Sequence, residues 1–225
     1  MYSIVALLAC VSAAAASICC VPPQWEGSHS FVTTIVHNGK PIVSTGYVTM
    51  AFDAVNRKIG QYEYITIGNT VQRRYGVLLD YNSNTKYIIN DQGRCYKHAL
   101  NRRKEDFGGC IPDNSTVVGQ KDVVGLGDNV MTVDTYRLDF GGVVAYISLT
   151  SDSCVPVVET IRGSLDGSLF LQNSHFLNIT GGLSAPENLN APPKGCEAAI
   201  EFNPHFSSGE AVPSTIGRRS YFLGL

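Results

Sequence analysis

The sequence predicts an all-β protein that folds as one antiparallel domain, a sandwich or a barrel. Apolar and polar residues alternate with a period of two in successive short segments, which is typical of strands with one face toward a core. Turn-forming residues separate these segments, and helical periodicity is nearly absent. The best helical candidate, around 196–202, is short, and prolines at 192, 193 and 204 flank it. A length of 225 residues fits one β domain.

Eight segments carry the alternation strongly enough to be predicted as strands. In the first of them, Val48, Met50 and Phe52 share one face. The glycine-rich stretch 100–128 lacks the pattern and is interpreted as a long irregular excursion within the same domain. The predicted strands, in chain order, are 42–52, 59–67, 73–81, 85–90, 130–140, 143–150, 154–162 and 168–180.

Turn-forming residues join these strands in pairs and predict antiparallel hairpins. The polar tip 56–58 joins the first two strands, and the stretch 82–84 joins the next two. Gly141-Gly142 is a favourable tight-turn pair between 130–140 and 143–150. The short connections therefore favour an antiparallel arrangement.

Several strands carry apolar residues on both faces; Val77 and Leu79, for example, lie opposite Leu78. In an antiparallel sheet such a strand needs a packed layer on each face, or an apolar cavity on one of them. The pattern alone favours ordinary two-sided packing, and a pocket is the alternative. The candidate pocket residues are Val48, Met50, Phe52, Val77, Leu79, Val143 and Ile147.

Residues 1–16 are predicted to be a signal peptide that is cleaved from the mature chain. Residues 4–16 form an apolar run that ends in small residues, as signal peptidase requires, and Ser17 becomes the new N-terminus. The run is too short to span a bilayer, which needs about 20 residues. A buried N-terminal helix is the alternative. We therefore expect a secreted, extracellular protein, or one delivered to the lysosomal lumen, that does not span a membrane.

Removing the signal peptide also removes Cys10 and leaves six cysteines. An even number of cysteines in an oxidising compartment favours disulfides, although the count leaves their connectivity open. A zinc site is the weaker alternative, because the chain has no C-x-x-C pair. The six cysteines are Cys19, Cys20, Cys95, Cys110, Cys154 and Cys196.

Two N-glycosylation sequons agree with export. They begin at Asn114 and Asn178, and Asn114 is the better candidate because it follows Pro112 in a turn-like stretch.

The composition and the missing motifs exclude several function classes. A net charge of −2 is too balanced for a nucleic-acid binder. The chain has no G-x-S-x-G motif for a nucleophilic serine. Its acidic residues do not form an EF-hand loop or a paired-carboxylate site. We therefore expect no enzymatic activity and no required cofactor.

Five short motifs, in this order, resemble the ependymin family of secreted glycoproteins over roughly residues 19–200. The segment that begins at Cys154 is the sharpest match, because it looks like the family's Cys-x-Pro-Val-x-Glu-Thr. The motifs are Cys20-Val-Pro-Pro-Gln-Trp25-Glu26-Gly27, Arg94-Cys95, Ile111-Pro112-Asp-Asn114-Ser115-Thr116, Cys154-Val155-Pro156-Val157-Val158-Glu159-Thr160 and Ala191-Pro192-Pro193-Lys-Gly-Cys196.

The resemblance implies a disulfide pattern with one departure. The cysteine that the vertebrate-type family pattern places near 61–64 is missing, and no cysteine follows Cys196. A replacement third bridge is the economical inference, and which member of the adjacent pair bonds which partner stays open. The implied pairs are Cys20 (or Cys19) with Cys154, Cys95 with Cys196 and, as the third, Cys19 with Cys110.

The resemblance also implies a fold and a function. The fold is two strongly curved antiparallel sheets that form a half-open barrel around an apolar pocket, similar to bacterial lipoprotein carriers. Residues 17–225 are then one ependymin-like domain with an irregular tail from about 203. The implied function is binding of a fatty acid or another lipid by a homodimer, with Ca²⁺ as an associated ion whose ligands the sequence does not identify. The alternative is an extracellular matrix or cell-adhesion protein that acts through its glycosylated outer surface.

Overall fold

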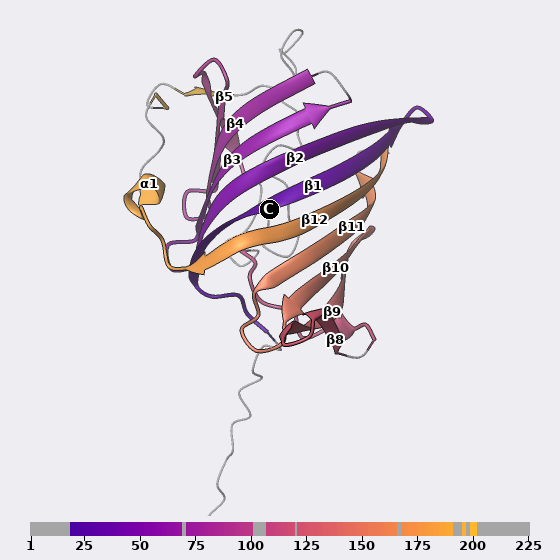
Figure 1. Cartoon of the computed structure of the whole chain (residues 1–225). Helices are drawn as coiled ribbons and strands as arrows, with labels where there is room; N and C mark the ends of the chain where they lie inside the picture. The colour runs from indigo at the N-terminus through magenta and orange to yellow at the C-terminus, as the bar shows by residue number, and fades with distance from the viewer. Residues whose placement is uncertain are drawn as a thin grey trace, which may run out of the picture.

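The computed structural model describes residues 19–68, 71–100, 107–119, 121–165, 168–190, 195–196 and 199–201 (Figure 1). The predicted signal peptide and the predicted tail from about 203 lie outside these residues.

The described residues form one 13-stranded sheet and a short helix. All neighbouring strands are antiparallel except β13 and β6, and the two ends of the sheet do not pair with each other. The order across the sheet is β13-β6-β5-β4-β3-β2-β1-β12-β11-β10-β9-β7, and β8 also pairs with β9. The elements are β1 (Gln24–His37), β2 (Lys40–Asp53), β3 (Lys58–Ile67), β4 (Val71–Asp80), β5 (Thr85–Asn90), β6 (Cys95–Ala99), β7 (Thr116–Val117), β8 (Asp122–Leu126), β9 (Asn129–Phe140), β10 (Val143–Thr150), β11 (Pro156–Leu165), β12 (Ser168–Gly181), α1 (Glu187–Asn190) and β13 (Ile200–Glu201).

The predicted all-β class is confirmed, and the sheet is open. The two curved sheets of the prediction are two halves of one continuous sheet. Figure 1 shows β3–β5 on one side of the long central strands and β9–β11 on the other. The central strands β1, β2 and β12 have 14 residues each. Strands of this length twist enough to belong to both halves, so no break is needed between them.

The eight predicted strands are present, but sequence reasoning missed β1 and the shorter strands β6, β7, β8 and β13. The stretch 100–128, interpreted as irregular, contains β7 and β8, which both pair with β9. The turn Asn38-Gly39 joins β1 to β2, and both residues have the positive φ that a two-residue hairpin turn requires. The alternation in β1 is obscured because its buried face carries the polar residues His29 and Thr33 beside Phe31.

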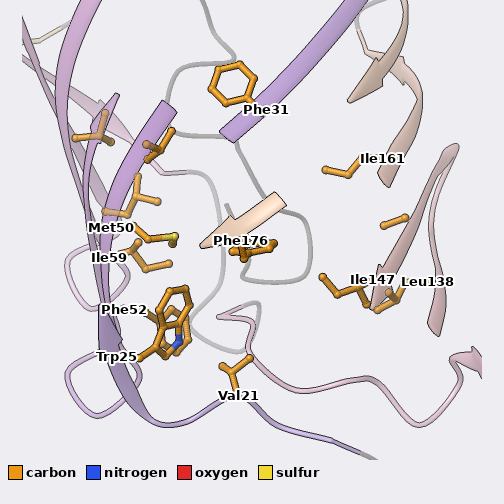
Figure 2. Packing of buried hydrophobic residues seen from close by; sticks show 14 of the residues in the cluster. Val21, Trp25, Phe31, Met50, Phe52, Ile59, Leu138, Ile147, Ile161 and Phe176 are labelled. Carbon is orange, nitrogen blue, oxygen red and sulfur yellow. The ribbon is translucent and has the colours of Figure 1, made fainter. Parts of the chain in front are cut away.

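The core lies on the concave side of the sheet. Met50, Phe52 and Ile59 belong to the β2–β3 half and point toward Ile147 and Ile161 of the opposite half (Figure 2). Figure 2 also labels Phe31 and Phe176, on the central strands β1 and β12, between these two groups. One hydrophobic cluster therefore joins both halves.

The positions of Cys19 and Cys20 in the fold explain which of the alternative disulfide pairings forms. Cys20 lies directly opposite Cys110 in an antiparallel bridge, with Cα atoms 3.9 Å apart. Neighbouring side chains of an extended chain point to opposite sides, so Cys19 points into the core and bonds Cys154. The first-named pairs Cys20–Cys154 and Cys19–Cys110 therefore do not form.

The third disulfide joins Cys95 to Cys196. Cys95 begins β6, and the bond brings the chain after Cys196 alongside that strand. Ile200 and Glu201 pair in parallel with Tyr96 and Lys97. The segment 196–202, whose helical pattern was too short to predict a helix, thus forms a strand at Ile200 and Glu201, because cross-linking to a sheet edge offers it a strand partner.

Asp53 ends β2 and holds the turn that leads to β3. Its carboxylate accepts hydrogen bonds from the backbone N (3.0 Å) and Nδ2 (2.7 Å) of Asn56 and from Nε2 of Gln24 (3.1 Å). Burial by itself would raise the pKa of Asp53, but the hydrogen bonds favour the ionised form and lower the pKa below its ordinary value.

We expect Asp53→Asn to lower the free energy of unfolding at neutral pH by about 1–3 kcal/mol, because buried donors lose a charged acceptor. The pKa of Asp53 is lower in the folded than in the unfolded chain. Its ionised form therefore contributes stability above about pH 4, and this is lost as the pH falls through the folded value. The gap between variant and wild type should shrink in acid.

Denaturant titrations at pH 7 and pH 3 measure this gap. Asp122→Asn, at an exposed position on β8, is the control and should unfold like the wild type at both pH values. An equal loss for Asp53→Asn at both pH values would contradict the prediction.

Candidate functional site

The candidate site is the concave face of the sheet, defined by the inward side chains of β1–β4 and β9–β12. The structure brings all seven predicted pocket residues together in the core cluster on this face. They come from three strands on both halves of the sheet, and their exposed fractions lie between 0% and 7%. By strand, they are Val48, Met50 and Phe52 on β2, Val77 and Leu79 on β4, and Val143 and Ile147 on β10.

Two short segments cover the concave face beside Phe52. Val21 N–H donates to the carbonyl oxygen of Gly109, and Ile111 N–H donates to that of Cys19, both at 2.7 Å. The Cys20–Cys110 bridge lies between these two bonds, so residues 19–21 and 107–111 form one unit. The ring of Phe107 lies 5.2 Å from that of Phe52. Part of the face is therefore covered by the chain itself.

Polar side chains also point inward on this face, and sequence reasoning missed them. Their signal was their position in the alternation, two residues from an inward apolar residue. Thr33 Oγ1 donates to Gln172 Oε1 (2.9 Å), and Gln172 Nε2 donates to Ser174 Oγ (3.1 Å). The buried polar residues whose register places them on the inward face are His29, Thr33, Gln61, Glu63, Glu159, Gln172 and Ser174.

Two buried side chains on this face, Gln61 and Trp25, carry polar atoms without a hydrogen-bond partner in the described chain. Within the described part of the chain, neither Nε2 nor Oε1 of Gln61 has a hydrogen-bond partner, and Trp25 Nε1 has none either. Buried polar atoms are nearly always paired, and leaving them unpaired is unfavourable. The concave face therefore holds unused hydrogen-bonding capacity within an apolar cluster.

A groove lies beside α1, on the outer face of the sheet. This groove has a volume of about 800 Å³, and its outward-facing lining includes Tyr62, Leu78 and Leu189. Glu26 holds the segment before α1, because its Oε1 accepts hydrogen bonds from the backbone N (2.9 Å) and Oγ (3.0 Å) of Ser184. Two predicted pocket residues, Met50 and Val77, also belong to the lining of this groove, although both are buried in the core cluster.

Both sequon asparagines are exposed. Asn114 lies in a turn just before β7. Asn178 lies on β12 with φ +52°, at the irregularity where Ser28 of β1 pairs with Leu177. Each asparagine is therefore accessible from outside the fold, as glycosylation would require.

The described residues do not fit the Ca²⁺ ion that the sequence resemblance suggested. No group of three or more His, Cys, Asp or Glu side chains able to hold a metal occurs among them. The buried carboxylate of Asp53 accepts hydrogen bonds in the turn, and the partly exposed carboxylate of Glu26 accepts them from Ser184. We derive no role for calcium from this part of the chain.

None of the helices in the described residues is long and apolar enough to cross a membrane.

Comparisons with known proteins were made for the sequence and the fold. A family model described as Ependymin matches residues 69–196, more than half of the 225 residues. No curated protein sequence matches the chain.

Among solved structures, a DUF1329 family protein from Desulfovibrio piger is 9% identical, with a TM-score of 0.30. The match covers 75% of this chain and 90% of that one. A β-barrel-like protein of the domain of unknown function DUF1849 from Brucella abortus is 8% identical, with a TM-score of 0.32. That match covers 72% of this chain and 98% of the other. Similarities at this level do not bear on function.

Proposed function

Because this chain belongs to the ependymin family, we propose that it is a secreted glycoprotein that holds a fatty acid or another lipid against the concave face of its sheet. The observation that carries the proposal is that apolar side chains on the two halves of the open sheet face each other. Met50 and Phe52 on one half face Ile147 and Ile161 on the other (Figure 2). The strands that carry them are not neighbours in the sheet.

The binding energy would come from removing an acyl chain from water. Each buried methylene contributes about 0.8 kcal/mol, so roughly ten of them support micromolar affinity or better after entropic losses. The predicted pocket residues are already covered in the chain without ligand. A ligand therefore reaches them only by displacing part of that cover, and binding is coupled to local opening.

The first prediction concerns occupancy of the concave face. Protein purified from a secreting host should carry a releasable lipid, detected by native mass spectrometry. Ala145→Phe adds a ring on this face of β10, where Ala145 is fully buried. We expect it to weaken binding of a fluorescent fatty acid by about tenfold or more. Overpacking itself destabilises by about 1–3 kcal/mol, so thermal unfolding must show that the variant is folded.

Val144→Phe is the matched control. Val144 is the next residue on β10 and points to the outer face, so the same ring there should leave fatty-acid binding unchanged. The carrier function is contradicted if repeated preparations contain no lipid and the wild type binds no fluorescent fatty acid.

A second candidate function, matrix or cell adhesion through the outer surface, is favoured by the exposure of both sequon asparagines. If glycans on them mediate adhesion, replacing Asn114 and Asn178 by Gln should weaken cell attachment to a matrix coated with the protein. Fatty-acid binding should stay as in the wild type, because both residues lie away from the concave face. Unchanged attachment would exclude this function for the glycans.

The homodimer remains a prediction, and the outer face supplies a surface for the second copy. Thr34 of β1 pairs with Val43 of β2 and with Leu171 of β12, and both of these apolar residues are 44% exposed. Val32 lies beside them and is 49% exposed. Contiguous exposed apolar residues on a folded protein commonly mark an interaction surface.

We expect Val43→Glu to convert a dimer into a monomer, because it places a charge at the centre of this surface. Size-exclusion chromatography with light scattering measures the mass. Val123→Glu on β8, where Val123 is 64% exposed, is the control and should leave the mass unchanged. A wild type that is monomeric at all concentrations would refute the dimer.

A further inference from the structure

We propose that Gln61 binds the polar end of the ligand, and that this end is an uncharged group that both donates and accepts hydrogen bonds. The inference rests on the carrier function proposed above and adds the chemical class of its ligand. Gln61 lies on β3, where it pairs with Met50 of β2 and with Val77 of β4. All three side chains are inward and buried.

The first observation is that the Gln61 amide is buried and unpaired in the described part of the chain. The side chain is 2% exposed, and neither its nitrogen nor its oxygen has a hydrogen-bond partner within the described chain. An apolar residue at this position would avoid the penalty of burying an unpaired amide. The arrangement is therefore explained by a partner that the folded chain does not itself supply.

Gln172 shows that this face can satisfy an amide when the role is structural. It is also a buried glutamine on the concave face, at 4% exposure. Its oxygen accepts from Thr33 and its nitrogen donates to Ser174. The two glutamines thus differ in hydrogen bonding, while their burial is alike.

Trp25 is the second observation and is independent of Gln61. Its indole is fully buried and stacks on Phe52 with ring centroids 5.6 Å apart, but Nε1–H has no partner among the described residues. Phe52 is the partner of Trp25 across β1 and β2, and Met50, two residues earlier on β2, pairs with Gln61. Both unpaired groups therefore lie in the same half of the concave face.

The hydrogen-bonding groups of Gln61 and Trp25 indicate which class of ligand they can bind. A carboxamide offers one acceptor and two donors without charge, and an indole offers one donor. A hydroxyl or a primary amide can satisfy the carboxamide in both directions. An anionic head group would be buried near the carboxyl group of Glu63, two residues along the same face of β3. The geometry points to a neutral amphiphile, such as a long-chain alcohol or amide, rather than to a fatty-acid anion.

The test uses the full glycosylated chain, stripped of lipid, and three probes of equal chain length. These are 1-hexadecanol, 1-bromohexadecane and palmitate at pH 7.4, each displacing the neutral fluorophore N-phenyl-1-naphthylamine. The wild type should bind the alcohol about 3- to 10-fold more tightly than the bromide, as expected for one or two net hydrogen bonds. Palmitate should bind more weakly than the alcohol.

Gln61→Met should abolish the preference for the alcohol over the bromide. It should also unfold at the same or a higher temperature than the wild type, because an unpaired buried amide is removed. Gln172→Met is the matched control: the same substitution on the same face breaks two hydrogen bonds. It should lower the unfolding temperature and keep the preference.

The outcomes separate this inference from the carrier function. If the wild type binds no probe, the carrier function itself fails. If the wild type binds all probes without preferring the alcohol, the carrier function stands and the inference about Gln61 is overturned. If Gln61→Met keeps the preference, a buried water satisfies the amide, and Gln61 does not select the ligand.

Discussion

Every inward side chain of this protein depends on the antiparallel pairing of β1 with β2 on one side and with β12 on the other. Successive residues of a strand point to opposite faces, so the register of these pairs decides what lies in the core. A slip of one residue in β1 would turn His29 and Phe31 outward and bring Val32 inward. The turn Asn38-Gly39 sets the register at one end of β1. The irregularity beside Asn178 adjusts it near the other end.

Long central strands also explain why the sheet is continuous and still curved enough to enclose a core. Residues of β1, β2 and β12 contribute to both halves, and the apolar cluster joins the halves without a hydrogen-bonded closure between the end strands. The Cys20–Cys110 bridge then fixes residues 19–21 and 107–111 over the part of the concave face next to Phe52. The same cover that completes the core therefore limits the access of a ligand to it.

Two buried glutamines of the concave face differ in whether the folded chain satisfies their hydrogen bonds. Gln172 is buried with its hydrogen bonds made, and it contributes to stability as buried polar networks usually do. Gln61 is buried without partners, which lowers stability and is most easily understood if a ligand completes its bonds. Natural proteins tend to break the rules of packing at functional sites. The contrast between these two residues is the reason for placing the proposed ligand site on a face that is otherwise an ordinary core.

The sequence by itself determined the all-β class, the eight strands with clear alternation and the inward position of residues such as Met50 and Phe52. Those features follow from local periodicity and turn chemistry, which neighbouring residues decide. Sequence reasoning missed β1 because buried polar residues such as His29 interrupt its pattern. It could not choose between Cys19 and Cys20 because adjacent cysteines have nearly the same spacing to every partner. It overlooked Gln61 because a polar residue in a strand gives no sign of whether its amide is paired. Only the tertiary structure decided these points, because strand register, the direction of each side chain and the satisfaction of a buried hydrogen bond depend on residues far apart in the chain.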